Sequence, residues 1–382
     1  MTRNAFAVVV LVVALTGCAA GGGTASSDPN GTTRAYYVAA DEVPWDYVAG
    51  GVDQISGLPF KTTGYFKASP GDRTPFGKPR PVASAYTKTL YREYTDSTFR
   101  TLKPRPAEWQ HLGFLGPVIR GVVGDTISIY FRNNGHQPFS MHPHGVFYNK
   151  DSEGAPYQDG TTERDKSDDG VSPGGTHLYV RPVPERAGPA EHDKSSVIWM
   201  YHSHHDEVKD INTGLMGPII ITARGKAKAD GSPNDVDREF VTAFMQVHEE
   251  DSWLAGQNIG KNFQTVTPPP PGLSQNFYPY FVTFSINGFT HGTLPTAALT
   301  MNKGERVRWY VFSSTNDFDT HSPHWHGNSL VINHMRMDVT SITPMEMIVA
   351  DMVPDNPGTW LFHCHISFHF TEGMGARYVV TQ

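Results

Sequence analysis

The chain of 382 residues is long enough for two domains, each with its own core. Its formal net charge is −7 and it has no basic run, so we expect no nucleic-acid partner. Gly (37 residues) and Pro (29) are frequent, and charged residues make up only 18% of the chain. This composition favours a turn-rich, all-β protein over a helical one.

The first eighteen residues predict export. Arg3 precedes the apolar run AFAVVVLVVA, which is too short to span a bilayer and is typical of a secretory signal. The ending Leu15-Thr16-Gly17-Cys18 resembles the lipobox of bacterial lipoproteins, in which the cysteine carries the lipid. We expect residues 1–18 to be a signal peptide, residues 19–35 a flexible tether, and the protein to be lipid-anchored at the outer face of a bacterial membrane, in the cell envelope or periplasm. A plain signal peptide that is cut elsewhere is the alternative.

One series of motifs occurs twice along the rest of the chain. In the first half an alternating strand, GDTISIYFRNN, is followed by HPHG (142–145) and then by WMYHSH (199–204). In the second half GERVRWYVFSS is followed by HWHG (324–327) and then by WLFHCH (360–365). The repeat predicts two homologous β domains, residues 36–225 and 238–382. The polar stretch 226–237 between them, with Gly and Pro, reads as a linker.

The four His-x-His pairs indicate metal binding. About one such pair would be expected by chance at this histidine content. Residues i and i+2 of a strand point to the same face, so each pair presents two imidazoles together. Cys364 lies between His363 and His365 and therefore points to the opposite face. A strand of this kind can hold metal on both sides.

Cys364 has no partner for a disulfide if Cys18 carries the lipid. A Cys thiolate, two His and a weak axial Met are the ligands of a blue-copper electron-transfer centre. His369 and Met374 follow the cysteine closely, and His321 is available earlier in the same domain. Zinc also accepts Cys and His, but it gives no reason for the other imidazoles.

The motifs HPHG, HSH, HSPHWHG and HCHISFHFTEGM resemble, in order and spacing, the four copper-binding motifs of the multicopper oxidases. The segments YREYTDSTFR, FLGPVIRG, YNKDSEGAPYQDGTT and HSHHDEVKDINTGLMGPIII resemble the paired domains of its ceruloplasmin-like members, within a two-domain, small-laccase-type bacterial framework. The resemblance implies two cupredoxin-like Greek-key β-sandwich domains. It also implies four coppers per chain.

The ligand set follows from the resemblance, residue by residue. The type 1 copper would bind His321, Cys364, His369 and Met374. The type 2 copper would bind His142 and His324. One type 3 copper would bind His144, His202 and His365, and the other His204, His326 and His363.

The resemblance also implies a mechanism. A small reducing substrate gives single electrons to the type 1 copper, and the electrons pass through Cys364 to His363 and His365. The trinuclear cluster then reduces O2 to water. Asp206 and Asp210, just after HSHH, are candidates for supplying protons, with solvated surface acids as the alternative.

Domain 1 lacks its own type 1 site. Counted along the repeat, the positions of His321, Cys364 and His369 become Phe139, Ser203 and Val208. Domain 1 therefore supplies ligands only to the cluster, which draws half its imidazoles from each domain. The resemblance implies a homotrimer of head-to-tail chains with clusters between neighbouring subunits.

The substrate is predicted from departures from the ferroxidase pattern. The positions of its iron-binding acid, glutamate and histidine are Phe368, Pro279 and Phe284 here, and apolar side chains cannot hold Fe2+. Aromatic rings near the copper favour a laccase-like oxidase of phenols or aromatic amines. Oxidation of Fe2+, Cu+ or Mn2+ is the alternative, because these positions could equally be plain core.

Two other classes fit less well. A copper nitrite reductase, with its single type 2 copper, needs neither HSH nor both histidines of HCH. A non-enzymatic copper-binding protein needs no strand-coupled cysteine. The pair Asp168 and Asp169 matches a calcium-binding stretch of ceruloplasmin-type domains, with a solvated acidic loop as the equal alternative.

Overall fold

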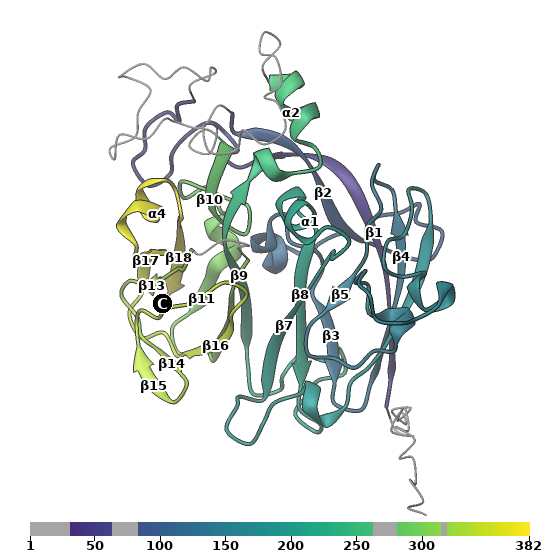
Figure 1. Cartoon of the computed structure of the whole chain (residues 1–382). Helices are drawn as coiled ribbons and strands as arrows, with labels where there is room; N and C mark the ends of the chain where they lie inside the picture. Colours follow the sequence, from purple (N-terminus) through teal and green to yellow (C-terminus); the bar gives the residue numbers. More distant parts are fainter. Residues whose placement is uncertain (1–30, 63–82, 263–280, 315–318) are drawn as a thin grey trace, which may run out of the picture.

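The computed structural model describes residues 31–62, 83–262, 281–314 and 319–382. The expected signal peptide, its lipobox and most of the tether lie outside these residues, as does Pro279. The described chain forms four β-sheets stacked face to face, from the C-terminal sheet at the left of Figure 1 to the N-terminal sheet at the right. Two β-sandwiches thus stand side by side, as the all-β, cupredoxin-like prediction requires.

Each sandwich has two sheets, and the sheets are numbered here by layer. Layer 1 has the order β2 (Ala85–Tyr94), β1 (Thr33–Asp46), β4 (Thr126–Asn133), β6 (Thr176–Pro182). Layer 2 has the order β3 (Ile119–Val122), β8 (Met216–Thr222), β7 (Ser196–His202), β5 (His142–Pro143). Layer 3 has the order β10 (Val282–Ile286), β9 (Arg238–His248), β12 (Val307–Ser313), β16 (Met347–Met352), β14 (Leu330–Ile332), β15 (Met335–Met337). Layer 4 has the order β11 (Thr300–Asn302), β18 (Gly375–Thr381), β17 (Gly358–Cys364), β13 (Pro323–Trp325).

The two sandwiches repeat the same topology. The parallel pair β1–β4 of layer 1 recurs as β9–β12 of layer 3. The parallel pair β3–β8 of layer 2 recurs as β11–β18 of layer 4. The ligand-bearing strands also correspond, because β5 pairs antiparallel with β7 and β13 with β17. The internal repeat of the sequence is therefore a repeat of strand order.

Three apolar cores separate the four layers. Alternate side chains of a strand face opposite sides, so an inner sheet must be apolar on both faces. Strand β7 shows this, with Ile198 and Met200 in the core between layers 2 and 3 and Tyr201 in the core between layers 1 and 2. Strand β17 places Phe362 and Cys364 in the core between layers 3 and 4.

The predicted linker 226–237 is folded back on the first sandwich. Ala227 and Pro233 form a β-bridge, and the hydroxyl of Thr222 donates to the Gly231 carbonyl over 2.7 Å. This stretch is therefore not an extended spacer, although its composition is polar. The expected N-terminal tether, residues 19–35, overlaps strand β1, which begins at Thr33.

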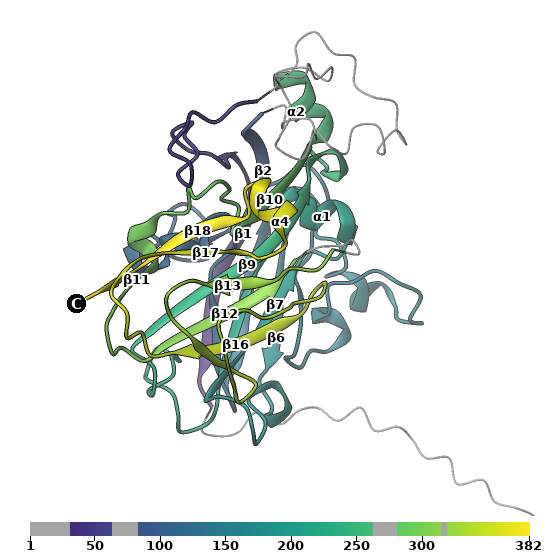
Figure 2. The same cartoon turned by 90° about the vertical axis from the view of Figure 1, so that its left-hand side faces the viewer.

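Three α-helices are described, α1 (Glu207–Thr213), α2 (Ala255–Asn262) and α4 (Ser367–Thr371), and Figure 2 shows them gathered at one end of the stacked sheets. Helices α1 and α4 directly follow the ligand strands β7 and β17. Short 3-10 turns include η2 (Ala107–Leu112) and η6 (Glu249–Asp251). In the described part of the chain, no helix is long and apolar enough to cross a membrane.

Candidate metal centres

Strand β17 carries the cysteine and a histidine on opposite faces, as the sequence predicted. Cys364 is fully buried in the core between layers 3 and 4. His363 points away from this core, and its register partner on β13 is His324. Alternation along one strand thus gives a thiol site on one side and an imidazole site on the other.

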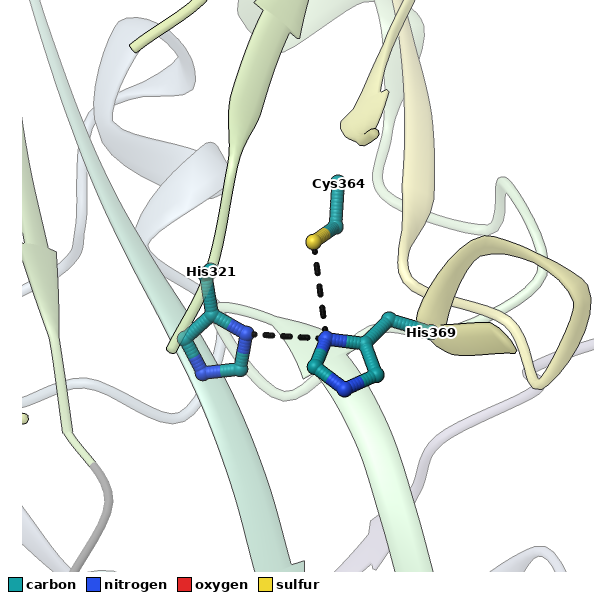
Figure 3. A group of neighbouring side chains, drawn as sticks. All are labelled: His321, Cys364 and His369. Carbon is teal, nitrogen blue, oxygen red and sulfur yellow. Dashed lines mark hydrogen bonds between the residues drawn. The ribbon is translucent and has the colours of Figure 1, made fainter. Parts of the chain in front are cut away.

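Three donor atoms converge on the thiol side (Figure 3). The Nδ1 atom of His369 lies 3.5 Å from the Cys364 sulfur and 3.3 Å from the Nδ1 atom of His321. All three side chains are buried, His369 being 3% exposed and the other two 0%. A backbone contact also orients the sulfur, because the Ser322 N–H points at it from 3.3 Å. A soft thiolate with two imidazoles is a donor set that suits copper.

Met374 adjoins this pocket. It is fully buried in the same core as Cys364, and its carbonyl accepts the Cys364 N–H over 3.1 Å. His369 lies on α4, and its carbonyl accepts the Met374 N–H over 2.9 Å. The residues between the cysteine and the methionine therefore form one tight loop that returns to the thiol.

Sequence reasoning missed Asp319. Its carboxylate accepts a hydrogen bond from the Nε2 atom of His369 over 3.0 Å, and its side chain is 28% exposed. Burial lowers the pKa of His321 to about 4. Burial also acts to lower the pKa of His369, but Asp319 and then Cys364 outweigh it and raise that pKa to about 9. The sequence offers one signal for this contact with His369, which is that Asp319 lies two residues before the predicted ligand His321.

Aromatic rings cover the outer side of His369. The ring of Phe284 stacks on its imidazole, with centroids 4.9 Å apart and an angle of 29° between the planes. The ring of Phe368 meets Phe284 edge-on at 5.1 Å. Two of the three positions expected to be polar in a ferroxidase are thus apolar contacts of the thiol site.

On the imidazole side of layer 2, four histidines form a first quartet: His142, His144, His202 and His204. The Nε2 atoms of His144 and His202 are 3.2 Å apart, and the ring of His142 lies 5.1 Å from that of His204. Beside the quartet is an open cavity of about 390 Å³, lined by His142, His144, Tyr148 and Arg186 among others.

A second quartet, His324, His326, His363 and His365, forms on layer 4. The Nε2 atoms of His326 and His363 are 3.0 Å apart. The ring of His324 lies 5.3 Å from that of His363 and 5.1 Å from that of His365. The two quartets occupy equivalent places in the two sandwiches.

Backbone carbonyls fix the orientation of four of these rings. The Nδ1–H groups of His142, His202, His324 and His363 donate to the carbonyls of Glu153, Ser203, Asp338 and Cys364, over 2.7–3.0 Å. Their Nε2 atoms are therefore left as acceptors, which is the form that binds a metal. Burial lowers the pKa of His142 and of His363 to about 4, so both rings are neutral at pH 7.

The glycine that ends HPHG and the glycine that ends HWHG each let a tryptophan pack closely against the ligand strands. Gly145 and Gly327 have φ of 77° and 75°. An added Cβ would lie 2.2 Å from the Trp199 ring at Gly145 and 2.3 Å from the Trp360 ring at Gly327. Close approach and backbone conformation both require glycine here. This explains why HxHG and the tryptophan recur together.

The two quartets do not meet within one chain. Layers 2 and 4 are separated by layer 3, and packed sheets lie about 10 Å apart, so the quartets are roughly 20 Å apart or more. Among the described residues, no ring contact or hydrogen bond joins a histidine of one quartet to a histidine of the other. Each quartet is half of the predicted cluster.

The thiol site has a polar counterpart in the first sandwich. Ser203 occupies the place of Cys364, since the Ser140 N–H donates to its hydroxyl over 3.0 Å as the Ser322 N–H does to the sulfur. Phe139 occupies the place of His321, as predicted, with the same type of β-bridge to a following segment.

The prediction of Val208 at the place of His369 is wrong. Val208 is 47% exposed on α1. Asp210 takes that place instead, because its carbonyl accepts the Leu215 N–H just as the His369 carbonyl accepts the Met374 N–H. Its carboxylate accepts the Ser203 hydroxyl over 2.6 Å.

The acids expected to supply protons have structural roles in the chain. Asp210 is buried, its other oxygen accepts the Trp253 Nε1–H over 2.8 Å, and it lies on the core side of the strand, away from the quartet. Asp206 caps the first turn of α1 and pairs with Lys209 over 2.5 Å. Glu207, which sequence reasoning did not select, is the carboxylate beside the quartet, 3.5 Å from the Nε2 atom of His204.

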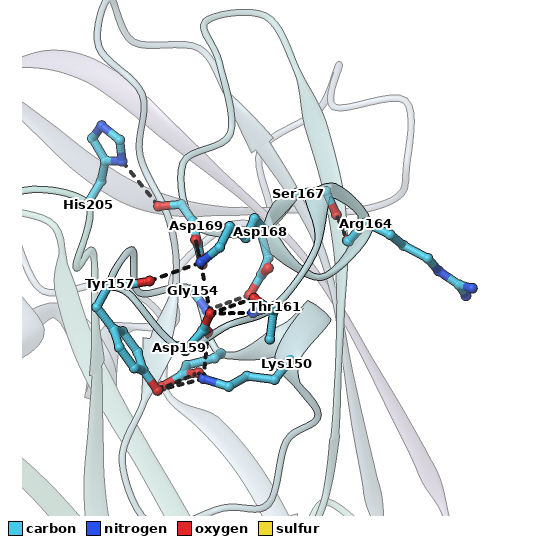
Figure 4. A network of polar contacts seen from close by, with 12 residues as sticks. Lys150, Gly154, Tyr157, Asp159, Thr161, Arg164, Ser167, Asp168, Asp169 and His205 are labelled. Atoms are coloured by element: carbon cyan, nitrogen blue, oxygen red, sulfur yellow. Dashed lines mark hydrogen bonds and ion pairs between the residues drawn. The ribbon is translucent and has the colours of Figure 1, made fainter.

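Asp168 and Asp169 lie in a polar network that Figure 4 shows. One Asp168 oxygen accepts the Gly154 N–H over 2.6 Å, and the other is buried without a partner among the described residues. Burial raises the pKa of Asp168 to about 6. Asp169 already has a cationic neighbour, because Lys166 is 3.7 Å from its carboxylate.

Comparison with known proteins agrees with this geometry. Two family models, each described as multicopper oxidase, match residues 111–226 and 265–382. The chain therefore belongs to the multicopper oxidase family, as the motifs predicted. Solved structures with the same fold include one titled as a multicopper oxidase, with a TM-score of 0.55 at 16% identity over 93% of this chain and 92% of that one. A blue copper oxidase from Nitrosomonas europaea gives a TM-score of 0.55 at 16% identity over 91% of this chain and 86% of that one.

Curated relatives are more similar in sequence but much longer. Ferroxidase HEPHL1 of Homo sapiens is 39% identical over 353 residues, which is 91% of this chain and 29% of the relative. Human hephaestin is 38% identical over 359 residues, 92% of this chain and 30% of the relative. Human ceruloplasmin is 34% identical over 348 residues, 91% of this chain and 31% of the relative. The chain thus spans about a third of the length of these relatives.

Proposed function

We propose that the protein is an oxidase that takes single electrons from a small reducing substrate and reduces O2 to water. One observation carries the proposal: β17 holds a buried thiol on one face, within 3.5 Å of an imidazole, and an imidazole of the second quartet on the other. A copper-delivery protein needs no such coupling. A copper nitrite reductase needs only some of the quartet histidines.

Of four coppers per chain, one would be held at the thiol site and three at the quartets. His321, Cys364, His369 and Met374 would hold the type 1 copper, as expected from the motifs. The quartets would hold the type 2 copper, at His142 and His324, and the two type 3 coppers. Copper, when bound, would supply one-electron exchange at the thiol site and dioxygen reduction at the quartets.

The pairing of rings within each quartet supports this assignment. His144 and His202 are the pair 3.2 Å apart, and both were assigned to one type 3 copper. His326 and His363 are the pair 3.0 Å apart, and both were assigned to the other. Each pair still needs one imidazole from the opposite quartet, His365 or His204.

The chain's own groups prepare both places for this chemistry. Burial of Cys364 keeps water from the thiolate, and the Ser322 N–H stabilises its charge. Cys364 and His363 are neighbours in the chain, so the backbone connects the thiol site to the second quartet through covalent bonds. The Cys364 carbonyl, which accepts the His363 Nδ1–H, adds a hydrogen bond to this connection. On the oxygen-reducing side Glu207 is placed to hold a proton near His204.

The separation of the quartets supports a homotrimer with clusters between subunits. Because roughly 20 Å and one sheet lie between them, the two halves of a cluster must come from neighbouring chains. A head-to-tail contact forms a closed ring when the rotation between neighbours closes, and the proposed ring has three subunits. Each subunit would give its first quartet to one neighbour and its second quartet to the other.

For the substrate we propose a phenol or aromatic amine. Phe284 and Phe368 present aromatic surface beside His369, and Asp319 can accept a substrate proton close to the same ring. Oxidation of a metal ion is the second candidate, and the similarity to proteins named as ferroxidases favours it.

Two further expectations belong to the same proposal. Calcium at Asp168 and Asp169 would neutralise the buried oxygen of Asp168, and calcium prefers such oxygen ligands. Export and a lipid anchor at Cys18 would place the enzyme at the outer face of a bacterial membrane. Metabolic labelling with a fatty acid tests the anchor, with Cys18→Ala as the control.

Metal analysis combined with visible and EPR spectra of the purified protein tests the proposal. Four coppers per chain, with an intense blue absorption and both EPR-active and EPR-silent copper, are expected. One copper per chain, or no blue absorption, would refute it. Turnover of 2,6-dimethoxyphenol compared with Fe2+ and Cu+ then separates the two substrate classes.

A further inference from the structure

The first sandwich contains a second cavity, of about 640 Å³, that has no role in the proposed oxidase. Its walls come from β1, β2, β3, the turn η2 and the loops on either side of η2. Strands β2 and β3 are edge strands of layers 1 and 2, whereas β5, which carries His142, lies at the opposite edge of layer 2. Small-molecule sites in proteins are typically roughly 300–1,000 Å³. The cavity therefore has the size of a ligand site and is separate from the quartets.

Most of the lining of this cavity is apolar. It includes the partly buried indole rings of Trp45 and Trp109, and the side chains of Leu102, Pro104, Pro106 and Phe114. The Trp45 Nε1–H donates to the Gly288 carbonyl over 2.7 Å, which fixes this ring. The guanidinium of Arg120 lies 5.4 Å from the centre of the Trp109 ring and fixes the other. Two held indole rings favour a flat aromatic ligand, because aromatic rings stack on one another.

Four cations also line the cavity, and one of them has no carboxylate partner. Three pair with a carboxylate within 3.7 Å: Arg92 with Asp41, Lys103 with Glu93 and Arg120 with Glu239. Arg105 forms no such pair with any of the described residues. Of its five N–H groups, two donate to backbone carbonyls, Nη1 to Gly113 over 2.6 Å and Nη2 to Leu115 over 2.7 Å. The remaining N–H groups of Arg105 are available to a ligand.

The charge of Arg105 is poorly compensated where it lies. Burial lowers the pKa of Arg105. Burial acts in the same direction on Arg120, but the carboxylate of Glu239 outweighs it and raises that pKa. A carboxylate suits a guanidinium because both groups are planar and can form two parallel hydrogen bonds. The contrast between the two arginines favours an anionic ligand at Arg105.

We propose that this cavity binds an aromatic carboxylate, with the carboxylate on the guanidinium of Arg105 and the ring against Trp45 and Trp109. The apolar walls account for the ring, and the unpaired cation accounts for the acid group. The ligand is bound without chemical change. No proposed copper ligand is among the residues that line the cavity, so the proposal does not depend on the oxidase function.

The walls of the cavity also join the two sandwiches. Trp45 bonds to Gly288, and the Phe114 N–H donates to the Asn287 carbonyl over 3.2 Å. Both acceptors belong to the second sandwich, as does Glu239, the partner of Arg120. A ligand that holds these walls in place should therefore stabilise the contact between the sandwiches, and with it the folded chain.

Calorimetry of the copper-loaded full chain tests binding, with 2-naphthoate as the probe. One site is expected, and the uncharged 2-naphthamide, which has the same ring, should bind about 10-fold or more weakly. Arg105→Gln should weaken 2-naphthoate by about 10-fold or more and should remove the preference for the acid over the amide. No binding of 2-naphthoate to the native chain, or equal affinity for the acid and the amide, would overturn the proposal.

Leu102→Trp tests the same site without changing Arg105. Leu102 lines the cavity and is 37% exposed, so an indole there can fill the cavity without disturbing the core. Binding of 2-naphthoate should fall by about 10-fold or more, because the ring meets the new side chain. Leu178→Trp is the matched control, at a leucine that is 42% exposed on β6, and it should bind as the native chain does.

The melting temperature gives a second readout. It should rise with the concentration of 2-naphthoate for the native chain and for Leu178→Trp, and much less for Leu102→Trp. Without ligand it shows whether each variant is folded. If Arg105→Gln does not fold, Leu102→Trp and the comparison of acid with amide decide. Native-like binding by Leu102→Trp would place the probe outside this cavity and overturn the proposal.

Discussion

The Nδ1 atom of His363 lies 2.7 Å from the carbonyl oxygen of Cys364, so the residue that carries the thiol also fixes the adjacent imidazole. The same relationship holds in the first sandwich, where Nδ1 of His202 lies 3.0 Å from the carbonyl oxygen of Ser203. The imidazole geometry is therefore a property of the repeated strand end and does not depend on the cysteine. Only the second sandwich adds a thiol to it.

Replacing the cysteine should separate the two sites. Cys364→Ser should fold, because Ser203 already occupies the equivalent place with an equivalent hydrogen bond from a backbone N–H. The blue absorption and turnover of 2,6-dimethoxyphenol should both be lost, because a hydroxyl is a poor copper ligand. The visible spectrum and the copper content check this. A Cys364→Ser variant that stays blue would contradict the assignment.

The glycine of each HxHG motif should be irreplaceable for two separable reasons. Gly327→Ala should cost about 1–2 kcal/mol for a positive φ and a further ~1–3 kcal/mol for the contact with Trp360. Gly304→Ala is the matched control, since its φ is 84° but an added Cβ meets nothing within 4 Å. Urea unfolding measures both. Equal destabilisation of the two variants would show that the tryptophan contact is unimportant.

Asp319 should position His369 from the outside. Asp319→Asn removes the charge that accepts the Nε2–H of His369, and loss of such an outer partner typically lowers metal affinity or activity 10–100-fold. Competition with a Cu2+ chelator, followed through the loss of the blue absorption, measures the affinity. Asp53→Asn, which affects a similar Asp–His pair at His291, should leave it unchanged. Equal effects of the two substitutions would remove Asp319 from the site.

Acid should weaken the contact between the two sandwiches through His111. This buried ring donates from Nδ1 to the Glu108 carbonyl over 2.7 Å and accepts the Val241 N–H of the second sandwich at Nε2 over 3.1 Å. Burial lowers its pKa from 6.5 to about 3, so its contribution is complete above pH 6.5 and is lost as pH falls toward 3. The slope should be roughly 1.4 kcal/mol per pH unit.

His111→Gln isolates that slope. Urea unfolding of the copper-free protein between pH 7 and pH 4 should show a shallower loss of stability in the variant, because glutamine does not titrate. The other buried histidines contribute equally to both proteins and cancel in the difference. Identical slopes would mean that His111 is protonated in the fold.

Local features of the sites could be predicted from the sequence, and long-range ones could not. Alternation along WLFHCH placed Cys364 and His363 on opposite faces, because that depends only on strand geometry. Counting along the repeat failed at Val208, because α1 has seven residues and α4 only five. Asp319 and Glu207 meet their histidines through folding of the loops, which no motif records. The separation of the two quartets by layer 3 depends on how the sheets stack, which the sequence does not show.

Complementation between two inactive chains tests the central claim most directly. One chain carries His142→Ala and His144→Ala, and the other carries His324→Ala and His326→Ala. Each alone should consume no O2 with 2,6-dimethoxyphenol, because every cluster lacks two of its imidazole ligands. Mixed trimers from co-expression should regain part of the native rate, since the intact first quartet of one chain then meets the intact second quartet of its neighbour. Native activity in a monomer, or mixed oligomers that stay inactive, would contradict clusters built between subunits.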